Sequence, residues 1–381
     1  MTSLSTFNAE NHPEANVLEK AKFILRHPVT RMKICFIAEL PQARMGGAEL
    51  QCYMIAERLA LKGYEIHYIC YEKAPELSKI NLNIHNIGED TSRGALRHIT
   101  SFFSALKEAN CDLYLQTCPR LATGLTALFC KLHNRIFVYR AVNLKDADLS
   151  FSKEYYWPDV KWWFKKAYSY GIKRADAIVC NSVRVAEKFK EKIKSPVIVI
   201  PNGHPIKPLE NIPLKEQYIL WAARLTDVKR PHLLVEIARR LPQYTFIMVG
   251  RGRYKLPALP KNVKFLGFKT GDALRSLYEK AAIFLNTSLI EGFPNTLIEA
   301  GMYYTPYVTF YDPDDVVKRY ELGFHVKSVE EAVQSIDELM QNPDLRRKMG
   351  MNIREYVEKN HNIETTVKLY EKLFKELLNE V

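Results

Sequence analysis

The segment Ser288–Ala300, with the sequence S-L-I-E-G-F-P-N-T-L-I-E-A, defines the fold class of this chain better than any other. An apolar run at 281–285 precedes it and predicts a buried strand. Pro294 suits the first turn of a helix, and we expect the side chain of Asn295 or Thr296 to cap that turn. A strand, a polar loop and a helix start in this order place unpaired backbone N–H groups where an anion can bind.

Two glutamates eight residues apart, Glu291 and Glu299, flank this turn. The pattern places Glu291 in the loop and Glu299 inside the helix. We therefore expect them to have different roles.

The same order of elements occurs in each half of the chain. In the first half, a strand at 33–39 leads through Gly46-Gly47 to a helix at 48–61 and a strand at 65–71, which predicts a right-handed βαβ unit. Pro201-Asn202-Gly203 is a turn signal. The second half restarts with a strand at 218–222. Further strands are predicted at 112–116, 135–140, 177–180, 197–200, 246–249, 263–266 and 308–310, with helices between them and at the C-terminus.

Length and composition indicate a globular protein of two domains. The chain has 381 residues, of which 47% are hydrophobic and 26% charged. No apolar run approaches the roughly 20 residues of a membrane span, and the N-terminus has no signal-peptide core. The seven cysteines include no Cys-x-x-Cys pair. We therefore expect buried thiols in a reducing cytoplasm.

The net charge of +12 is concentrated in residues 1–200, which carry 29 Lys and Arg against 20 Asp and Glu. Such a half can face a phospholipid surface or a phosphate-bearing acceptor, or it can be a basic solvated surface. Residues 155–174 mix aromatic and basic side chains. They fit either a bilayer interface or a core helix whose buried face contains Val160, Trp163, Ala167, Tyr170 and Ile172.

Arg224 and Lys229 follow the first strand of the second half, where two cations suit a diphosphate. Gly46-Gly47 and the helix N-terminus after Glu291 also follow strands, and both can bind an anion. In open α/β sheets, ligands bind at the carboxyl ends of the strands. We expect these three anion-binding elements to face one cleft. Together with a carboxylate that can accept hydrogen bonds from sugar hydroxyls, they indicate a site for a sugar nucleotide.

The segment E-G-F-P-N-T-L-I-E resembles the Glu-x7-Glu motif of the retaining glycosyltransferases of family four, also called group 1, which have the GT-B fold. The Arg224…Lys229 spacing, G-G-A-E at 46–49 and Pro201-Asn202-Gly203 are similar to further motifs of that family. The resemblance covers about residues 32–375. It implies an α/β protein of two Rossmann-like domains facing a cleft, with a C-terminal helix crossing back to the first domain.

The domain boundaries that we expect follow from this resemblance. Residues 1–31 would be an N-terminal extension. Residues 32–204, with about 363–381 packing back on them, would form the acceptor-binding domain. Residues 205–362 would form the nucleotide-sugar-binding domain.

The resemblance also implies roles for single residues. Glu291, Arg224 and Lys229 would be catalytic: Glu291 would contact the transferred sugar, and the two cations would neutralise the departing diphosphate without a metal. Glu299 would hold the ribose hydroxyls of the donor. The other donor-binding residues would be Gly46, Gly47, Gly250, Phe268 (near the base), Gly292, Phe293, Pro294, Asn295 and Thr296.

The expected activity is transfer of a sugar, typically a hexose, from a nucleotide-diphosphate sugar to a hydroxyl of a glycan or lipid-linked acceptor. The anomeric configuration would be kept, the leaving phosphate would take the acceptor's proton, and no cofactor would be needed. We expect a cytoplasmic protein that can lie at an anionic membrane surface, and no nucleic acid as partner.

The sequence departs from the family pattern at two places. The family often has a His after the strand at 135–140, where this chain reads R-A-V-N-L-K; Asn143 is the candidate replacement. The family's Gly-Gly loop after the second glutamate is absent. Asp312-Pro-Asp314 matches a metal-binding Asp-x-Asp pattern, but we interpret it as a turn that caps a helix.

Two other functions remain open. A sugar-nucleotide epimerase can share this architecture, although we find no general acid/base set for it. A non-catalytic basic protein that binds membranes or nucleic acid is the other alternative. The donor's base and sugar and the acceptor's identity are not determined by the sequence.

Overall fold

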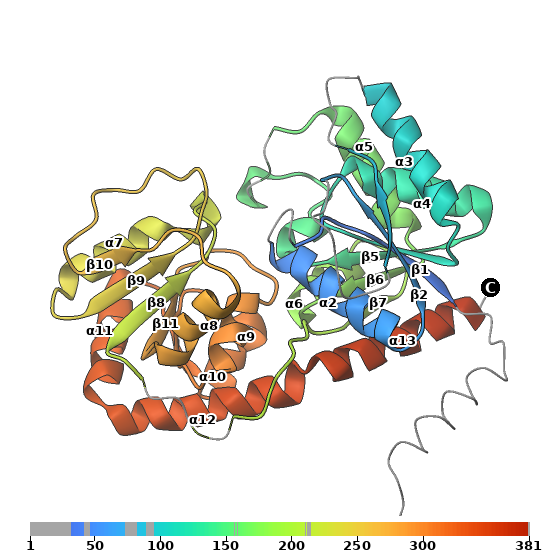
Figure 1. The fold of residues 1–381 in the computed structure, drawn as a ribbon. Coiled ribbons are helices and arrows are strands. Elements are labelled where there is room, and N and C mark those ends of the chain that lie inside the picture. Colours follow the sequence, from blue (N-terminus) through green and yellow to red (C-terminus); the bar gives the residue numbers. More distant parts are fainter. Residues whose placement is uncertain are drawn as a thin grey trace, which may run out of the picture.

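The computed structural model describes residues 32–41, 46–72, 82–88, 95–155, 157, 159–209, 211 and 215–379. The extension predicted for residues 1–31 lies outside these ranges. Within them, the chain forms two parallel β-sheets that lie in two separate lobes, each covered by helices (Figure 1). The prediction of an α/β fold with two such halves is confirmed.

The first sheet has the strand order β3-β2-β1-β4-β5-β6-β7 and the second the order β10-β9-β8-β11-β12-β13. The strands of the first are β1 Lys33–Ile37, β2 Glu65–Cys70, β3 Asn83–Asn86, β4 Leu113–Thr117, β5 Ile136–Ala141, β6 Ala177–Cys180 and β7 Val197–Val199. Those of the second are β8 Tyr218–Ala222, β9 Thr245–Val249, β10 Val263–Phe265, β11 Ile283–Asn286, β12 Tyr307–Thr309 and β13 Gly323–His325.

Helices cover both faces of each sheet. Those of the first half are α2 Gly47–Leu61, α3 Ala95–Ala109, α4 Leu121–His133, α5 Trp162–Arg174 and α6 Val183–Lys190. The later ones are α7 Pro231–Arg240, α8 Gly271–Lys280, α9 Asn295–Gly301, α10 Val316–Arg319, α11 Val329–Gln341, α12 Pro343–Asn360 and α13 Ile363–Asn379. Short 3-10 turns are η2 Leu144–Ala147, η3 Lys153–Tyr155, η4 Asp227–Lys229 and η5 Pro313–Asp315.

The central strands are apolar on both faces, as buried parallel strands must be. Ile34 and Phe36 of β1 pack in one hydrophobic cluster, whereas Cys35 and Ile37 pack in another on the opposite face. The second sheet likewise separates two clusters. Each lobe therefore has its own core.

The chain crosses between the lobes twice, and the crossings are hydrogen-bonded to each other. The N–H of His204 donates to the carbonyl of His361 (2.8 Å), and the N–H of Ile363 donates to the carbonyl of His204 (3.0 Å). After the second crossing, α13 runs back to the first lobe (Figure 1) and adds Tyr370 and Phe374 to its core. The lobes are thus joined by a two-stranded connection and a helix.

Both sheets have a point at which the strand order reverses. It lies between β1 and β4 in the first sheet and between β8 and β11 in the second. The loops that leave the carboxyl ends of two such strands diverge, and a crevice forms between them. The loops after β1, β8 and β11 are the ones in which the sequence predicted anion-binding residues.

The prediction for the buried face of α5 was wrong in part. Ile172 is fully buried as predicted, but Trp163, which we expected inside, is 42% exposed, and Tyr168, which was not among the predicted buried residues, is fully buried. The cause is the close contact with α4, where a Cβ atom on Gly171 would lie 2.5 Å from the carbonyl oxygen of Thr123. This contact turns the Tyr168 side of the helix inward, where its hydroxyl donates to the carbonyl of Asp146 (2.7 Å).

The sequence also missed two edge strands. β3 reads N-I-H-N and is largely exposed, so it lacks an apolar signature. β13 has only three residues. Neither affects the position of the cleft.

Candidate active site

A cleft of about 1010 Å³ lies between the lobes and takes side chains from both. Its volume is at the upper end of the range of roughly 300–1,000 Å³ that is usual for ligand sites. The space is therefore large enough for more than one small substrate.

Eleven of the thirteen residues predicted for the site line this cleft. They are Gly46, Gly47, Arg224, Lys229, Gly250, Phe268, Phe293, Pro294, Asn295, Thr296 and Glu299. The first two come from the N-terminus of α2 and the others from the second lobe. Glu291 and Gly292 are not among the lining residues.

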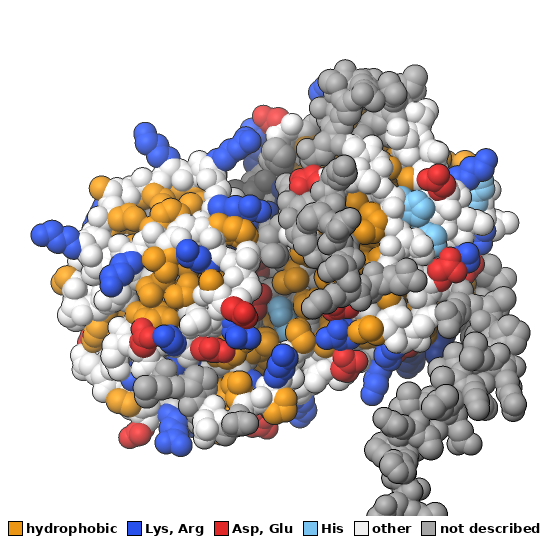
Figure 2. Space-filling model, viewed as in Figure 1, with side chains coloured by type: hydrophobic (Ala, Val, Ile, Leu, Met, Phe, Trp, Pro, Cys, Tyr) orange, Lys and Arg blue, Asp and Glu red, His pale blue; other side chains and the backbone are white. Residues whose placement is uncertain are grey.

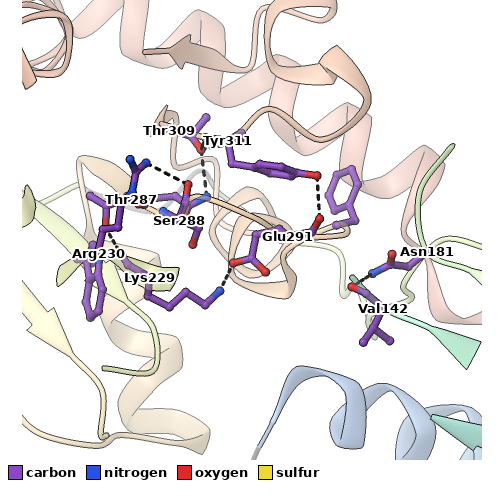
Figure 3. Close-up of polar contacts among 12 residues, drawn as sticks. Val142, Asn181, Lys229, Arg230, Thr287, Ser288, Glu291, Thr309 and Tyr311 are labelled. Atoms are coloured by element: carbon purple, nitrogen blue, oxygen red, sulfur yellow. Dashed lines mark hydrogen bonds and ion pairs between the residues drawn. The ribbon is translucent and has the colours of Figure 1, made fainter. Parts of the chain in front are cut away.

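The carboxylate of Glu291 forms an ion pair with Lys229, which does line the cleft (Figure 3). The two loops that carry this pair are tied to each other. The hydroxyl of Thr287 donates to the carbonyl of Lys229 (2.6 Å), and the guanidinium of Arg230 donates to the carbonyl of Thr287 (2.8 Å). The hydroxyl of Tyr311 donates to the carbonyl of Glu291 (2.8 Å). The charge of Lys229 is thus held at the cleft wall with its counter-ion beside it.

Gly292 is one of the points at which the second lobe contacts the first. A Cβ atom there would lie 2.3 Å from both the side-chain oxygen of Asn181 and the carbonyl oxygen of Val142. These two first-lobe residues are themselves linked, because the amide of Asn181 donates to that carbonyl (3.2 Å, Figure 3). The glycine of the E-G-F-P motif therefore has a steric reason in this structure.

The helix α9 begins differently from the prediction. Pro294 occupies the N-cap position, and no side chain caps the helix. Asn295, which we expected to cap it, uses its side chain between the lobes: it accepts from the amide of Asn202 (2.9 Å) and donates to the carbonyl of Gly47 (2.9 Å). The capping prediction was wrong, because both the oxygen and the nitrogen of the Asn295 amide form hydrogen bonds to residues outside the helix.

Glu299 lines the cleft one turn further along α9. Burial raises the pKa of its carboxyl group to about 7, and the phenol of Tyr278 beside it opposes this rise. A carboxylate in such a place gains from a hydrogen-bond donor, such as a sugar hydroxyl, that replaces the lost water.

Phe268 presents an exposed ring, 41% accessible, at the edge of the cleft. The guanidinium of Arg251 lies over this ring at 4.1 Å from its centre. Arg224, on the loop after β8, is also exposed to the cleft. An aromatic face next to two cations is suited to a nucleotide base with its phosphates.

A buried cluster of polar side chains, which the sequence did not predict, joins the lobes beside the cleft. The amide of Gln51 on α2 donates to the carbonyl of Gly203 (2.9 Å) and to the side-chain oxygen of Asn295 (3.3 Å). Arg140 donates to the side-chain oxygen of Asn202 (2.7 Å). Burial lowers the pKa of His204, in the same group, to about 4, so its ring is neutral. The turn Pro201-Asn202-Gly203 was the only feature of the sequence that pointed to this cluster.

Asn143, the candidate replacement for the family's His, also lines the cleft. Its side-chain oxygen accepts the N–H of Lys145 (3.0 Å) and so starts the turn η2. The side-chain amide is not used in that bond.

No group of three or more His, Cys, Asp or Glu that could hold a metal ion is found among the described residues. In the Asp312-Pro-Asp314 turn, Asp312 accepts the N–H groups of Val317 (2.8 Å) and Lys318 (3.1 Å) at the start of α10. Asp314 accepts the N–H groups of Val183 (2.8 Å) and Arg184 (2.9 Å) of the first lobe. Both carboxylates therefore cap helices, and the second adds a contact between the lobes.

Comparison with known families gives a match in each lobe. Residues 205–356 match the model described as glycosyl transferases group 1, and residues 45–207 match the model of glycosyltransferase family 4. The chain is 25% identical over 290 residues to the GalNAc-alpha-(1->4)-GalNAc-alpha-(1->3)-diNAcBac-PP-undecaprenol alpha-1,4-N-acetyl-D-galactosaminyltransferase of Campylobacter jejuni, covering 71% of this chain and 76% of that protein. It is 32% identical over 155 residues to the alpha-galactosylglucosyldiacylglycerol synthase of Streptococcus pneumoniae, covering 36% and 41%.

Solved structures share the fold over nearly the whole chain. The sucrose-phosphate synthase of Thermosynechococcus elongatus superposes with a TM-score of 0.73 at 16% identity, covering 92% of this chain and all of that one. HepE of Anabaena, in complex with UDP and glucose, gives 0.70 at 17% identity and covers 91% of this chain and all of that one. At these identities the likeness establishes the GT-B arrangement of the two lobes.

Proposed function

The chain belongs to the group 1 and family 4 glycosyltransferases, and from this premise we propose that it transfers a hexose from a nucleotide-diphosphate sugar to an acceptor hydroxyl, keeping the anomeric configuration and using no metal. One observation carries the proposal: Arg224, Lys229 and Glu299 of the second lobe line the same cleft as Gly46 and Gly47 of the first.

In the proposed complex, the donor's diphosphate lies between the cations and the start of α2. Arg224 and Lys229 stabilise the negative charge that builds up as the sugar–phosphate bond breaks. Glu299 accepts hydrogen bonds from the ribose hydroxyls, and the ring of Phe268 lies against the base. The exposure of that ring supports this last contact.

The chemical step exchanges one bond for another at the anomeric carbon. The bond from this carbon to the diphosphate oxygen breaks, the acceptor oxygen attacks from the same face, and its proton passes to the departing phosphate. Glu291 holds the transferred sugar. Its pairing with Lys229 supports this role, because an ammonium group that moves toward the diphosphate leaves the carboxylate available for a sugar hydroxyl.

The names of the relatives suggest the substrates. HepE is described with UDP and glucose, and the Campylobacter jejuni protein acts on a glycan carried by undecaprenyl diphosphate. We therefore propose a UDP-sugar as donor and a lipid-linked glycan as acceptor. Asn143, which lines the cleft, takes the place of the family's His at the far side of the sugar.

A transfer assay with a panel of UDP-sugars tests this function. The anomeric coupling constant of the new sugar, measured by NMR, is expected to match that of the donor. Activity is expected to persist in EDTA and to be lost in Glu299→Ala and Glu291→Ala. An inverted product or a metal requirement would refute that part of the proposal. Epimerised UDP-sugar without any transfer would favour the epimerase.

We also propose that the enzyme works at an anionic membrane surface. The described residues contain no helix that is long and apolar enough to span a membrane. On α5, however, Trp162 is 69% and Trp163 42% exposed, and the ammonium of Lys166 lies over the ring of Trp162 at 5.1 Å. Exposed tryptophans beside lysines are typical of interfacial helices. All seven cysteines are unpaired, which supports a cytoplasmic location.

Figure 2 shows Lys and Arg side chains on both lobes of the viewed face, so overall charge alone does not mark the membrane side. Flotation with phosphatidylglycerol vesicles at low and high salt tests the surface of α5. Binding at low salt is expected for the native protein and not for Trp162→Ser/Trp163→Ser. Equal binding of both proteins would rule this surface out.

A further inference from the structure

The first-lobe wall of the cleft contains buried hydrogen-bond donors that the proposed donor site does not use. Nη1 of Arg140 and Nε1 of Trp157 are both buried and have no hydrogen-bond partner among the described residues. The two side chains are 2% and 7% exposed, and both line the cleft. Buried polar atoms without partners are rare in folded proteins and call for an explanation.

Both atoms can only donate. An indole N–H and a guanidinium have no acceptor lone pair, so each needs an acceptor that the described residues do not supply, such as the oxygen of a ligand or of a water molecule. The other nitrogens of Arg140 are already engaged, with Nε donating to the hydroxyl of Tyr370 (3.1 Å) and Nη2 to Asn202 (2.7 Å). The remaining donor of Arg140 therefore has a fixed position.

A second cation lies in the same wall. The ammonium of Lys145 sits over the ring of Trp157 at 4.4 Å from its centre. The indole is held in turn by Phe151, whose ring centre is 4.7 Å away. Lys145 and Trp157 are thus a fixed pair that presents one positive charge and one N–H group.

A carboxyl group lies in the same wall. Asp146 accepts the N–H of Val142 (2.7 Å); burial raises the pKa of its carboxyl group to about 6, and the charges of Lys145 and Arg140 oppose that rise. The carboxylate of Glu49 lies over Gly46 at the start of α2. Asp146 therefore offsets part of the charge of the two cations, and the unsatisfied N–H groups of Arg140 and Trp157 are what this wall offers to a ligand.

We propose that Lys145 and the N–H of Trp157, with Arg140 behind them, bind an oxyanion carried by the acceptor sugar. The inference rests on the proposed function and identifies the acceptor class: a sugar that bears a phosphate or a carboxylate group. The donor's own diphosphate is assigned another place, between Arg224, Lys229 and the start of α2, and the test below occupies that place with UDP.

Calorimetry on the UDP-saturated protein tests the proposal with three probes: N-acetylglucosamine 1-phosphate, glucuronic acid and neutral N-acetylglucosamine. Saturation with UDP occupies the diphosphate site first. At least one anionic sugar is expected to bind about tenfold more tightly than the neutral one, as for a hydrogen bond to a charged group. The two anionic arms distinguish a phosphate from a uronic acid.

Two variants locate the binding. Lys145→Gln and Trp157→Phe are each expected to weaken the anionic sugar about tenfold while UDP affinity stays within about twofold of the native value. Lys194→Gln, an exposed lysine outside the cleft, is the charge control. If both variants bind the anionic sugar like the native protein, or if no anionic sugar is preferred, the inference fails. If UDP does not bind the native protein, the proposed function fails instead.

A stability measurement separates binding from a structural role. Trp157→Phe removes an N–H that has no partner, so its melting temperature is expected to equal or exceed that of the native protein. Trp221→Phe is the matched comparison, because its N–H donates to the hydroxyl of Thr287 (2.8 Å), and it is expected to melt at a lower temperature. A loss of stability in Trp157→Phe as large as that in Trp221→Phe would assign Trp157 to the core.

Discussion

The side-chain amide of Asn295 donates a hydrogen bond to the carbonyl oxygen of Gly47, 2.9 Å away on the opposite lobe. The same side chain accepts hydrogen bonds from Asn202 and Gln51. Asn295, the first residue of α9, thus connects this helix to the Gly46-Gly47 loop and to the chain crossing at Asn202.

Replacing Asn295 by Ala is expected to destabilise the protein by about 1–3 kcal/mol, because Asn202 and Gln51 lose an acceptor in a buried place. It is also expected to open the cleft. Thermal unfolding and the radius of gyration from small-angle X-ray scattering measure the two effects. Asn262→Ala is the control: its amide makes three hydrogen bonds within the second lobe, so it should lower stability without changing the radius. Equal radii for all three proteins would contradict the bridging role.

Gly292→Ala is expected to push the lobes apart. Its Cβ atom would lie 2.3 Å from the carbonyl oxygen of Val142, and a backbone carbonyl cannot rotate away as a side chain can. We expect a larger radius of gyration and a loss of transfer activity, with each lobe still folded by circular dichroism. An active Gly292→Ala protein with the native radius would show that the contact is not needed.

The carboxyl group of Glu299 gives stability a defined pH dependence. Its pKa rises from 4.5 to about 7 in the folded protein, so folding takes up a proton between these values. The native protein therefore loses stability as pH rises from about 4.5 through 7, by at most about 3 kcal/mol. Glu299→Gln should lack this part of the profile and be the more stable protein at pH 8. The free energy of unfolding is measured by denaturant titration at each pH. The same pH dependence in both proteins would show that Glu299 does not have the raised pKa.

The pair of Lys229 and Glu291 predicts opposite effects on donor binding. Glu291→Gln removes the counter-ion that competes for the ammonium, so UDP is expected to bind more tightly while transfer falls. Lys229→Ala is expected to weaken UDP and to lower the transfer rate by about 10²–10³. Glu187→Gln, exposed on α6, is the control for a lost negative charge. Weaker UDP binding in Glu291→Gln would mean that Glu291 only positions Lys229.

Local patterns in the sequence predicted the elements that carry strong periodic or turn signals. The buried strands, the loop at Gly46-Gly47 and the helix after Pro294 are of this kind. The polar cluster of Gln51, Asn202 and Asn295 that joins the lobes could not be predicted. Gln51 and Asn295 are 244 residues apart, and the sequence around each residue has no pattern that indicates a contact between them. The inward position of Tyr168 depends on how closely α4 approaches α5, which no single helix encodes.

We propose that both lobes form one metal-independent site for a nucleoside diphosphate. The change in melting temperature on adding UDP, GDP or ADP in EDTA measures binding to this site. One of the three, most simply UDP, is expected to raise the melting temperature of the native protein, and to do so much less in Lys229→Ala and Glu299→Ala. No increase with any nucleotide, or an increase in both variants as large as that of the native protein, would show that this site is not formed as proposed.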